Sequence, residues 1–132
     1  MDKRVMIVDD NDFVRDSVEM FFSTEGMEVH SAASGFDCLK HLENGFRGVL
    51  LLDIQMPGMD GWETLRRITE RDLHRDNTII ILTARIDSDC DDPELRRHVA
   101  DYIQKPFNPN ELLQIVKKYV EAPPPEQEAA FG

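Results

Sequence analysis

The hydrophobic residues of this chain gather in five short runs that are separated by polar segments. The run at 48–52 is continuous, which is typical of a central strand covered on both faces, whereas the run at 27–32 has Val29 as its clearest apolar member. Runs of this length predict β-strands. The predicted strands are residues 4–8, 27–32, 48–52, 78–82 and 99–103.

Between these runs the apolar positions recur every three or four residues, which is the spacing of a helix face. The first helix is expected to begin at Asp12 as its N-cap and to end near Gly26; Ser34 caps the second and Asn108 the last. A short helix is expected at 94–98. The apolar helix positions are Val14, Val18, Phe21, Phe22, Cys38, Leu39, Leu42, Trp62, Leu65, Ile68, Leu112, Leu113, Val116 and Val120.

Strand and helix patterns alternate five times in the first 121 residues. Helical connections require parallel strands and right-handed crossovers, so the pattern predicts an α/β fold, a three-layer sandwich. We expect one domain over residues 1–121 and a Pro-rich acidic tail or linker over 122–132. The residues alone leave open whether this is a stand-alone protein or a fragment of a longer one.

Composition narrows the function classes. The formal net charge of −11 disfavours direct nucleic acid binding and binding to anionic membranes by this domain. Cys38 and Cys90 lack the spacing of a zinc site, and Cys38 is expected to pack in the core. There is no apolar run of membrane-spanning length and no signal peptide pattern, so a cytoplasmic location is expected.

Polar residues with matching chemistry follow four of the predicted strands. Asp9, Asp10, Asp53, Thr83 and Lys105 each stand where an apolar run ends. The carboxyl ends of parallel strands share one edge of the sheet, where open α/β sheets bind ligands. Carboxylates, a hydroxyl and an ammonium group that converge there suit a divalent cation and a phosphoryl group.

Four segments that carry these residues resemble the receiver domains of two-component response regulators, in particular the chemotaxis-type single-domain receiver. They are Val8-Asp9-Asp10, Leu51–Gly61, Leu82-Thr83-Ala84 and Asp101–Phe107, and the resemblance covers residues 4 to about 120. It implies a flavodoxin-like, doubly wound sheet of five parallel strands in the order 2-1-3-4-5 with five helices.

The resemblance also implies the chemistry of the site. Asp53 is the phosphoacceptor, since an aspartate carboxylate can attack phosphorus and form an acyl phosphate. Asp9, Asp10, Asp53 and the backbone carbonyl of Gln55 are the implied ligands of Mg²⁺, with Mn²⁺ as an alternative.

Further roles follow from the resemblance for residues that would touch the phosphoryl group. Thr83 donates its hydroxyl to a phosphoryl oxygen, and the small Ala84 lets the group approach the backbone. Lys105 pairs with the phosphoacceptor, aimed by a cis peptide bond to Pro106. Tyr102 is the switch aromatic, which turns inward when Thr83 moves toward the phosphate.

Partners are implied in the same way. A sensor histidine kinase or a phosphotransfer protein donates the phosphoryl group. A downstream output domain or target protein is contacted through residues 86–107 and the last helix, and a phosphorylation-dependent homodimer is an open alternative. The protein would catalyse its own phosphorylation and dephosphorylation but act as a signalling module, not as a turnover enzyme.

Some features depart from the family pattern. The segment 85–93 is acidic and long, and Val99-Ala100 replaces the usual Gly-Ala. Residues 87–92 lack the glycine and glutamate of an EF-hand calcium loop. Gln55 and Arg85 occupy positions that tune water access, so they are expected to set the phosphoryl lifetime.

Rival functions can be weighed against the same residues. A phosphohydrolase of the haloacid dehalogenase type would need a second aspartate at the position of Gln55. A nucleotide-binding α/β module would need a glycine-rich phosphate-binding loop after the first strand, where Asp9 and Asp10 stand instead. A receiver-like protein-binding module that works without phosphorylation remains the main alternative.

Overall fold

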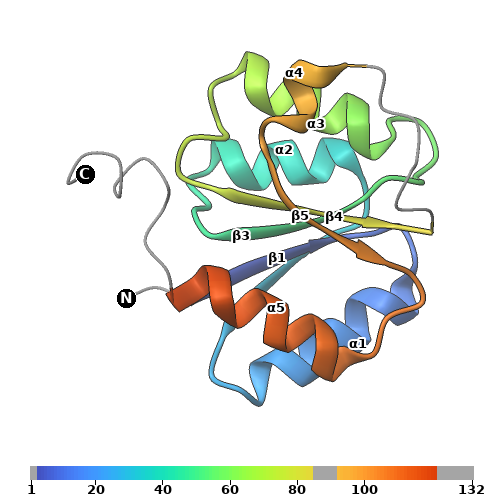
Figure 1. The fold of residues 1–132 in the computed structure, drawn as a ribbon, viewed down its shortest axis with the longest axis vertical. Coiled ribbons are helices and arrows are strands. Elements are labelled where there is room, and N and C mark those ends of the chain that lie inside the picture. Colours follow the sequence, from blue (N-terminus) through green and yellow to red (C-terminus); the bar gives the residue numbers. More distant parts are fainter. Residues whose placement is uncertain (1–2, 85–91, 122–132) are drawn as a thin grey trace.

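The computed structural model describes residues 3–84 and 92–121, which fold into alternating strands and helices (Figure 1). The strands are β1 (Arg4–Val8), β2 (Glu28–Ala32), β3 (Val49–Asp53), β4 (Thr78–Thr83) and β5 (Val99–Gln104). The helices are α1 (Asp12–Ser23), α2 (Gly35–Glu43), α3 (Gly61–Glu70), α4 (Pro93–Arg96) and α5 (Pro109–Glu121).

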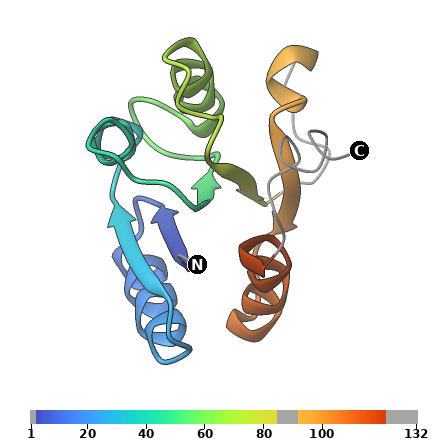
Figure 2. The ribbon, with the colours of Figure 1, turned by 90° about the vertical axis from the view of Figure 1, so that its left-hand side faces the viewer.

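The sheet is parallel and doubly wound. Its strands lie in the order β2-β1-β3-β4-β5, and every neighbouring pair is parallel. Helices α2, α3 and α4 cover one face and α1 and α5 cover the other, as the two views in Figures 1 and 2 show. The predicted fold class, strand order and three layers are therefore confirmed.

The core lies on both faces of the central strands. All five residues of β3 are buried, as the continuous apolar run predicts. Leu50 and Leu52 belong to the cluster under α2, α3 and α4, whereas Val49 and Leu51 belong to the cluster under α1 and α5. Cys38 is fully buried, as expected, and burial raises the pKa of its thiol to about 12. This leaves the thiol uncharged and unreactive at neutral pH.

The N-cap of α1 differs from the prediction. Asn11, not Asp12, is the cap, and its side chain accepts hydrogen bonds from the backbone of Phe13 and Val14 at 2.8 and 3.2 Å. Asp12 is the first helical residue and pairs with Arg15. Every residue from position 9 to 12 can cap a helix, so side-chain chemistry alone could not choose among them.

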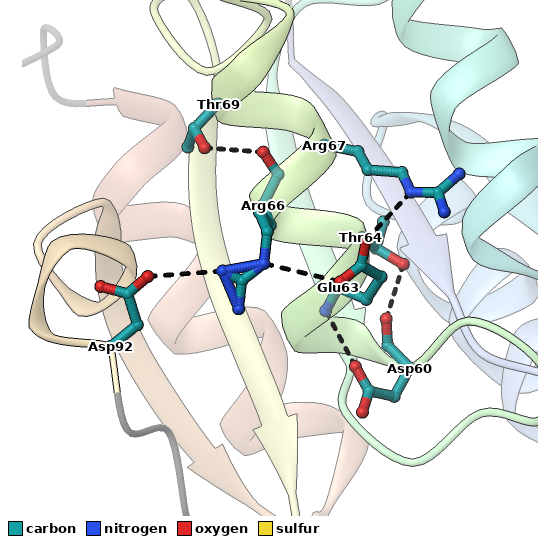
Figure 3. Close-up of polar contacts among 7 residues, drawn as sticks. All are labelled: Asp60, Glu63, Thr64, Arg66, Arg67, Thr69 and Asp92. Carbon is teal, nitrogen blue, oxygen red and sulfur yellow. Dashed lines mark hydrogen bonds and ion pairs between the residues drawn. The ribbon is translucent and has the colours of Figure 1, made fainter.

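An ion pair joins helix α3 to the N-cap of α4, and further polar contacts lie within α3 and its cap (Figure 3). Asp60 caps α3 by accepting from the backbone N–H of Glu63 at 2.8 Å. Arg66 Nε lies 3.5 Å from Glu63 Oε1 on the same helix, and Arg66 Nη1 lies 3.4 Å from Oδ2 of Asp92, the N-cap of α4. The helix expected at 94–98 instead runs Pro93–Arg96, because the cap sits at Asp92 and proline suits the first helical turn.

No helix within residues 3–84 and 92–121 combines the length and the apolar composition needed to cross a membrane.

Candidate functional site

The carboxyl ends of four strands place the predicted site residues at one edge of the sheet. Asp9 follows β1 directly, and Asp53 is the last residue of β3. Thr83 is the last residue of β4, and Lys105 follows β5. The arrowheads of β4 and β5 point to the same side of Figure 1, which is this edge. The topology therefore brings together residues that are up to 96 positions apart.

Lys105 joins the two buried carboxylates of the site. Its Nζ donates to Asp9 Oδ2 at 2.8 Å and lies 3.3 Å from Asp53 Oδ1. Asp9 and Asp53 are 1% and 3% exposed, whereas the side chain of Lys105 is 26% exposed. The sequence predicts a pair between Lys105 and Asp53; the structure adds Asp9 as the nearer partner. The ammonium thus neutralises part of a charge that burial would otherwise make very costly.

The environment of Asp53 favours its protonated form. Burial, and after it the charge of the nearby Asp9 carboxylate, raise the pKa of Asp53 from 3.8 to about 6, although Lys105 and the backbone N–H of Gln55 act in the opposite direction. The Gln55 N–H donates to Asp53 Oδ1 at 3.3 Å. A carboxylate held in this way gains from any cation that joins the site.

Lys105 keeps its charge in this environment. Burial lowers the pKa of Lys105, but the hydrogen bond to Asp9 and the charges of Asp53 and Asp9 outweigh it, so the pKa lies above its usual value. An ammonium group that stays protonated is a fixed positive charge beside Asp53.

Three carboxylates form a cluster with the donor chemistry of a magnesium site. One oxygen from each of Asp9, Asp10 and Asp53 lies within 4.8 Å of the others. Asp10 is exposed, while the other two are buried, so the cluster opens to solvent on one side. Oxygen-only ligands with room for water suit Mg²⁺, and the residues present therefore fit the ion. The ligand role of the Gln55 carbonyl stays a prediction.

Thr83, the last residue of β4, and Ala84, which follows it, both contact the end of β5. Thr83 is 3% exposed, and its backbone carbonyl accepts from the Lys105 N–H at 2.7 Å. The Ala84 carbonyl accepts from Gln104 Nε2 at 3.3 Å. The peptide bond between Lys105 and Pro106 is cis. These contacts fix the end of β4 against the residue that carries the ammonium group.

Of the two residues predicted to tune the phosphoryl lifetime, Gln55 is among the described residues and Arg85 is not. Gln55 is exposed beside the carboxylate cluster. Arg85 and most of the acidic segment, residues 85–91, lie outside the described residues, as does part of the predicted output surface. The tuning roles stay predictions.

Arg15 contacts the loop that carries the site carboxylates, and it was not among the residues predicted from the sequence. Its guanidinium donates to the backbone carbonyl of Asp9 at 2.8 Å and pairs with Asp12, and its side chain is only 17% exposed. The three-residue spacing from Asp12 to Arg15 is a helical pair that could have signalled it. Arg15 ties the first turn of α1 to the loop that carries Asp9 and Asp10.

Gly61 allows α3 to approach the backbone of Asp53. A Cβ at Gly61 would lie 2.5 Å from the Asp53 carbonyl oxygen and 2.7 Å from Ile54 Cα. The Gly61 N–H donates to the Ile54 carbonyl at 2.8 Å. The start of α3 is therefore seated directly on the segment that carries Asp53.

Substitution of Gly61 by alanine is expected to lower the free energy of unfolding by about 1–3 kcal/mol, because the added methyl group collides with backbone atoms that cannot move independently. Without the collision, alanine would stabilise a helical position by up to about 1 kcal/mol. Urea unfolding of wild type and Gly61→Ala checks this. A variant at least as stable as wild type would contradict the close approach.

Comparison with known proteins identifies the family. A sequence model of the response regulator receiver domain matches residues 5–117 of this chain. The chain belongs to the response regulator receiver domain family. The receiver domain is 33% identical over 118 residues to the transcriptional regulatory protein SrrA of Staphylococcus aureus, covering 89% of this chain and 47% of that protein. It thus spans about half the length of this relative.

Solved structures agree with the sequence comparison. A CheY-like receiver domain protein from Methanospirillum hungatei has a TM-score of 0.85 and 43% identity, covering 89% of this chain and 93% of that one. The response regulator TrrA from Thermotoga maritima, solved in complex with Mg(2+)-BeF, has a TM-score of 0.75 and 32% identity, covering 89% and 98%. The receiver domain therefore shares the fold of two-component signalling proteins.

Proposed function

We propose that this receiver domain accepts a phosphoryl group on Asp53 in a Mg²⁺-dependent reaction and relays it as a conformational signal. The observation that carries the proposal is the buried Asp53 carboxylate, which has Lys105 Nζ at 3.3 Å and one carboxylate oxygen from each of Asp9 and Asp10 within 4.8 Å. The TrrA complex, in which a related receiver holds Mg(2+)-BeF, supports the same chemistry here.

Residues of this chain would carry each part of the transfer. Oδ of Asp53 attacks phosphorus, the bond from phosphorus to the donor nitrogen of a phosphohistidine breaks, and the departing imidazole keeps the electron pair and takes a proton. Lys105 would offset the charge that spreads over the phosphoryl oxygens. Mg²⁺ held by Asp9, Asp10, Asp53 and the Gln55 carbonyl would supply further charge neutralisation and alignment.

The switch would follow from the new charge on Asp53. Thr83, the last residue of the neighbouring strand β4, would donate its hydroxyl to a phosphoryl oxygen, with the small Ala84 beside it. Tyr102 on β5 would then turn inward as Thr83 moves toward the phosphate. Hydrolysis of the acyl phosphate by water, at a rate set in part by Gln55 and Arg85, would return the domain to its starting state.

The proposed partners are those of two-component signalling. A sensor histidine kinase or phosphotransfer protein would be the donor. An output domain or target protein would read residues 86–107 and α5. We also propose that the domain ends near residue 121 and that 122–132 form a tail or linker, since the family model matches residues 5–117.

Intact mass measurement tests the proposal. After incubation with acetyl phosphate and Mg²⁺, wild type is expected to gain the mass of one phosphoryl group, and EDTA is expected to prevent it. Asp53→Asn is expected to gain nothing, whereas the matched control Asp16→Asn, on the exposed face of α1, is expected to behave as wild type. Folded wild type that gains no mass would favour the phosphorylation-independent binding module.

A further inference from the structure

An aromatic pair links the first turn of α3 to β5. The ring centroids of Trp62 and Tyr102 lie 6.5 Å apart, with an angle of 50° between the ring planes. Both side chains are half-buried and pack against the core cluster under α2, α3 and α4. This separation and tilt fall within the favourable range for aromatic pairs. The pair is therefore a specific contact and not an accident of two exposed rings.

The backbone at Trp62 is fixed relative to Asp53. Trp62 directly follows Gly61, whose N–H donates to the Ile54 carbonyl at 2.8 Å and where an added Cβ would lie 2.5 Å from the Asp53 carbonyl oxygen. Asp60 caps the same turn by accepting from the Glu63 N–H at 2.8 Å, and its carbonyl accepts from Thr64 Oγ1 at 2.8 Å (Figure 3). A displacement at the end of β3 would thus be passed to the backbone of Trp62 through the first turn of α3.

Tyr102 is connected to the other side of the site. On β5 it lies opposite Ile81 of β4, and two residues later Gln104 lies opposite Thr83. Alternate residues of a strand share a face, so Tyr102 lies on the face of the sheet that Ile81 and Thr83 also occupy. Three residues after Tyr102, Lys105 contacts both buried carboxylates. Asp53 is therefore connected to Trp62 through the start of α3 and to Tyr102 through Lys105 and β5, and the two rings contact each other.

We propose that Trp62 is a positioning residue of the switch. Its ring holds the Tyr102 ring against α3, and a change at Asp53 that moves Tyr102 alters the surroundings of Trp62 and carries the signal into α3. This inference rests on the proposed function. It adds α3 to the responding surface, beyond residues 86–107 and α5.

The chain contains one tryptophan, so its emission reports on Trp62 alone. Emission is recorded with Mg²⁺ only and then with Mg²⁺ and beryllofluoride, a phosphoryl mimic. Wild type is expected to show a shift of its emission between the two conditions. Tyr102→Phe, which keeps the ring, is expected to retain the shift, and Tyr102→Leu is expected to lose it. Circular dichroism confirms that each variant is folded.

A second measurement asks whether the two rings act as one element. The beryllofluoride concentration at half saturation is measured by thermal shift. It is expected to change by at least about threefold in Trp62→Leu and in Tyr102→Leu. The change in the double variant is expected to be no larger than the change in either single variant. Trp62→Phe is expected to restore most of the wild-type value. Additive single effects would overturn the inference.

Intact mass after treatment with acetyl phosphate separates the two levels of failure. If wild type gains a phosphoryl group while Trp62 emission stays the same, or if Tyr102→Leu keeps the full shift, only the positioning role of Trp62 is overturned. If folded wild type gains no phosphoryl group, the proposed function is overturned, and this inference falls with it.

Discussion

Replacement of Lys105 by methionine is expected to slow phosphorylation by acetyl phosphate by about 10²–10³-fold. Lys105 Nζ lies 3.3 Å from Asp53 Oδ1 and is the positive side chain that the structure places against both buried carboxylates. Removal of one preorganised group that stabilises developing charge typically costs this much. Methionine preserves the length and the apolar stem of the side chain, so the loss reports on the charge. The initial rate of mass gain measures it.

The matched control for this variant is Lys118→Met, because Lys118 is an exposed lysine in the last turn of α5. It is expected to be phosphorylated at the wild-type rate. Lys105→Arg keeps the charge but presents a planar fork in place of a point charge, so an intermediate rate is expected. If Lys105→Met were phosphorylated as fast as wild type, the proposed role of the ammonium group would be wrong.

The sheet was predictable from the sequence because its signal is local. The continuous apolar run at 48–52 is typical of a central strand covered on both faces, and the structure buries every residue of β3. The alternation of strands and helices required parallel pairing, which all four strand pairs show. The order of the strands came from the family resemblance, since periodicity gives no information on which strands are neighbours.

The contacts of the site were less predictable because they depend on tertiary structure. The chemistry of Lys105 indicates that it needs an acidic partner, but its distance of 96 residues from Asp9 leaves the choice of carboxylate to the fold. Trp62 occupies an apolar position on a predicted helix face, which is typical of core packing. Its contact with Tyr102 joins two residues that are forty positions apart in the chain, and no local pattern encodes it.

Substitution of Asp53 by asparagine is expected to stabilise the folded protein above about pH 6 when Mg²⁺ is absent. Burial and the Asp9 carboxylate raise the pKa of Asp53 from 3.8 to about 6. Between these values the folded protein binds more protons than the unfolded chain, so the free energy of unfolding falls as pH rises, and the loss levels off once the pH has passed through about 6. The shift corresponds to an upper bound of about 3 kcal/mol.

Urea unfolding at about pH 8 and about pH 4 measures this effect, since the stabilisation by Asp53→Asn should be present at the higher pH and largely lost at the lower. Asp16→Asn, at an exposed position of α1, should show no such difference. An equal effect of Asp53→Asn at both pH values would contradict the raised pKa.

Adding Mg²⁺ at about pH 8 should stabilise wild type more than Asp53→Asn, because binding to the folded carboxylate cluster adds to stability and asparagine removes one charged ligand. The same buried carboxylate that weakens the metal-free fold would then be what makes it responsive to Mg²⁺ and phosphoryl groups.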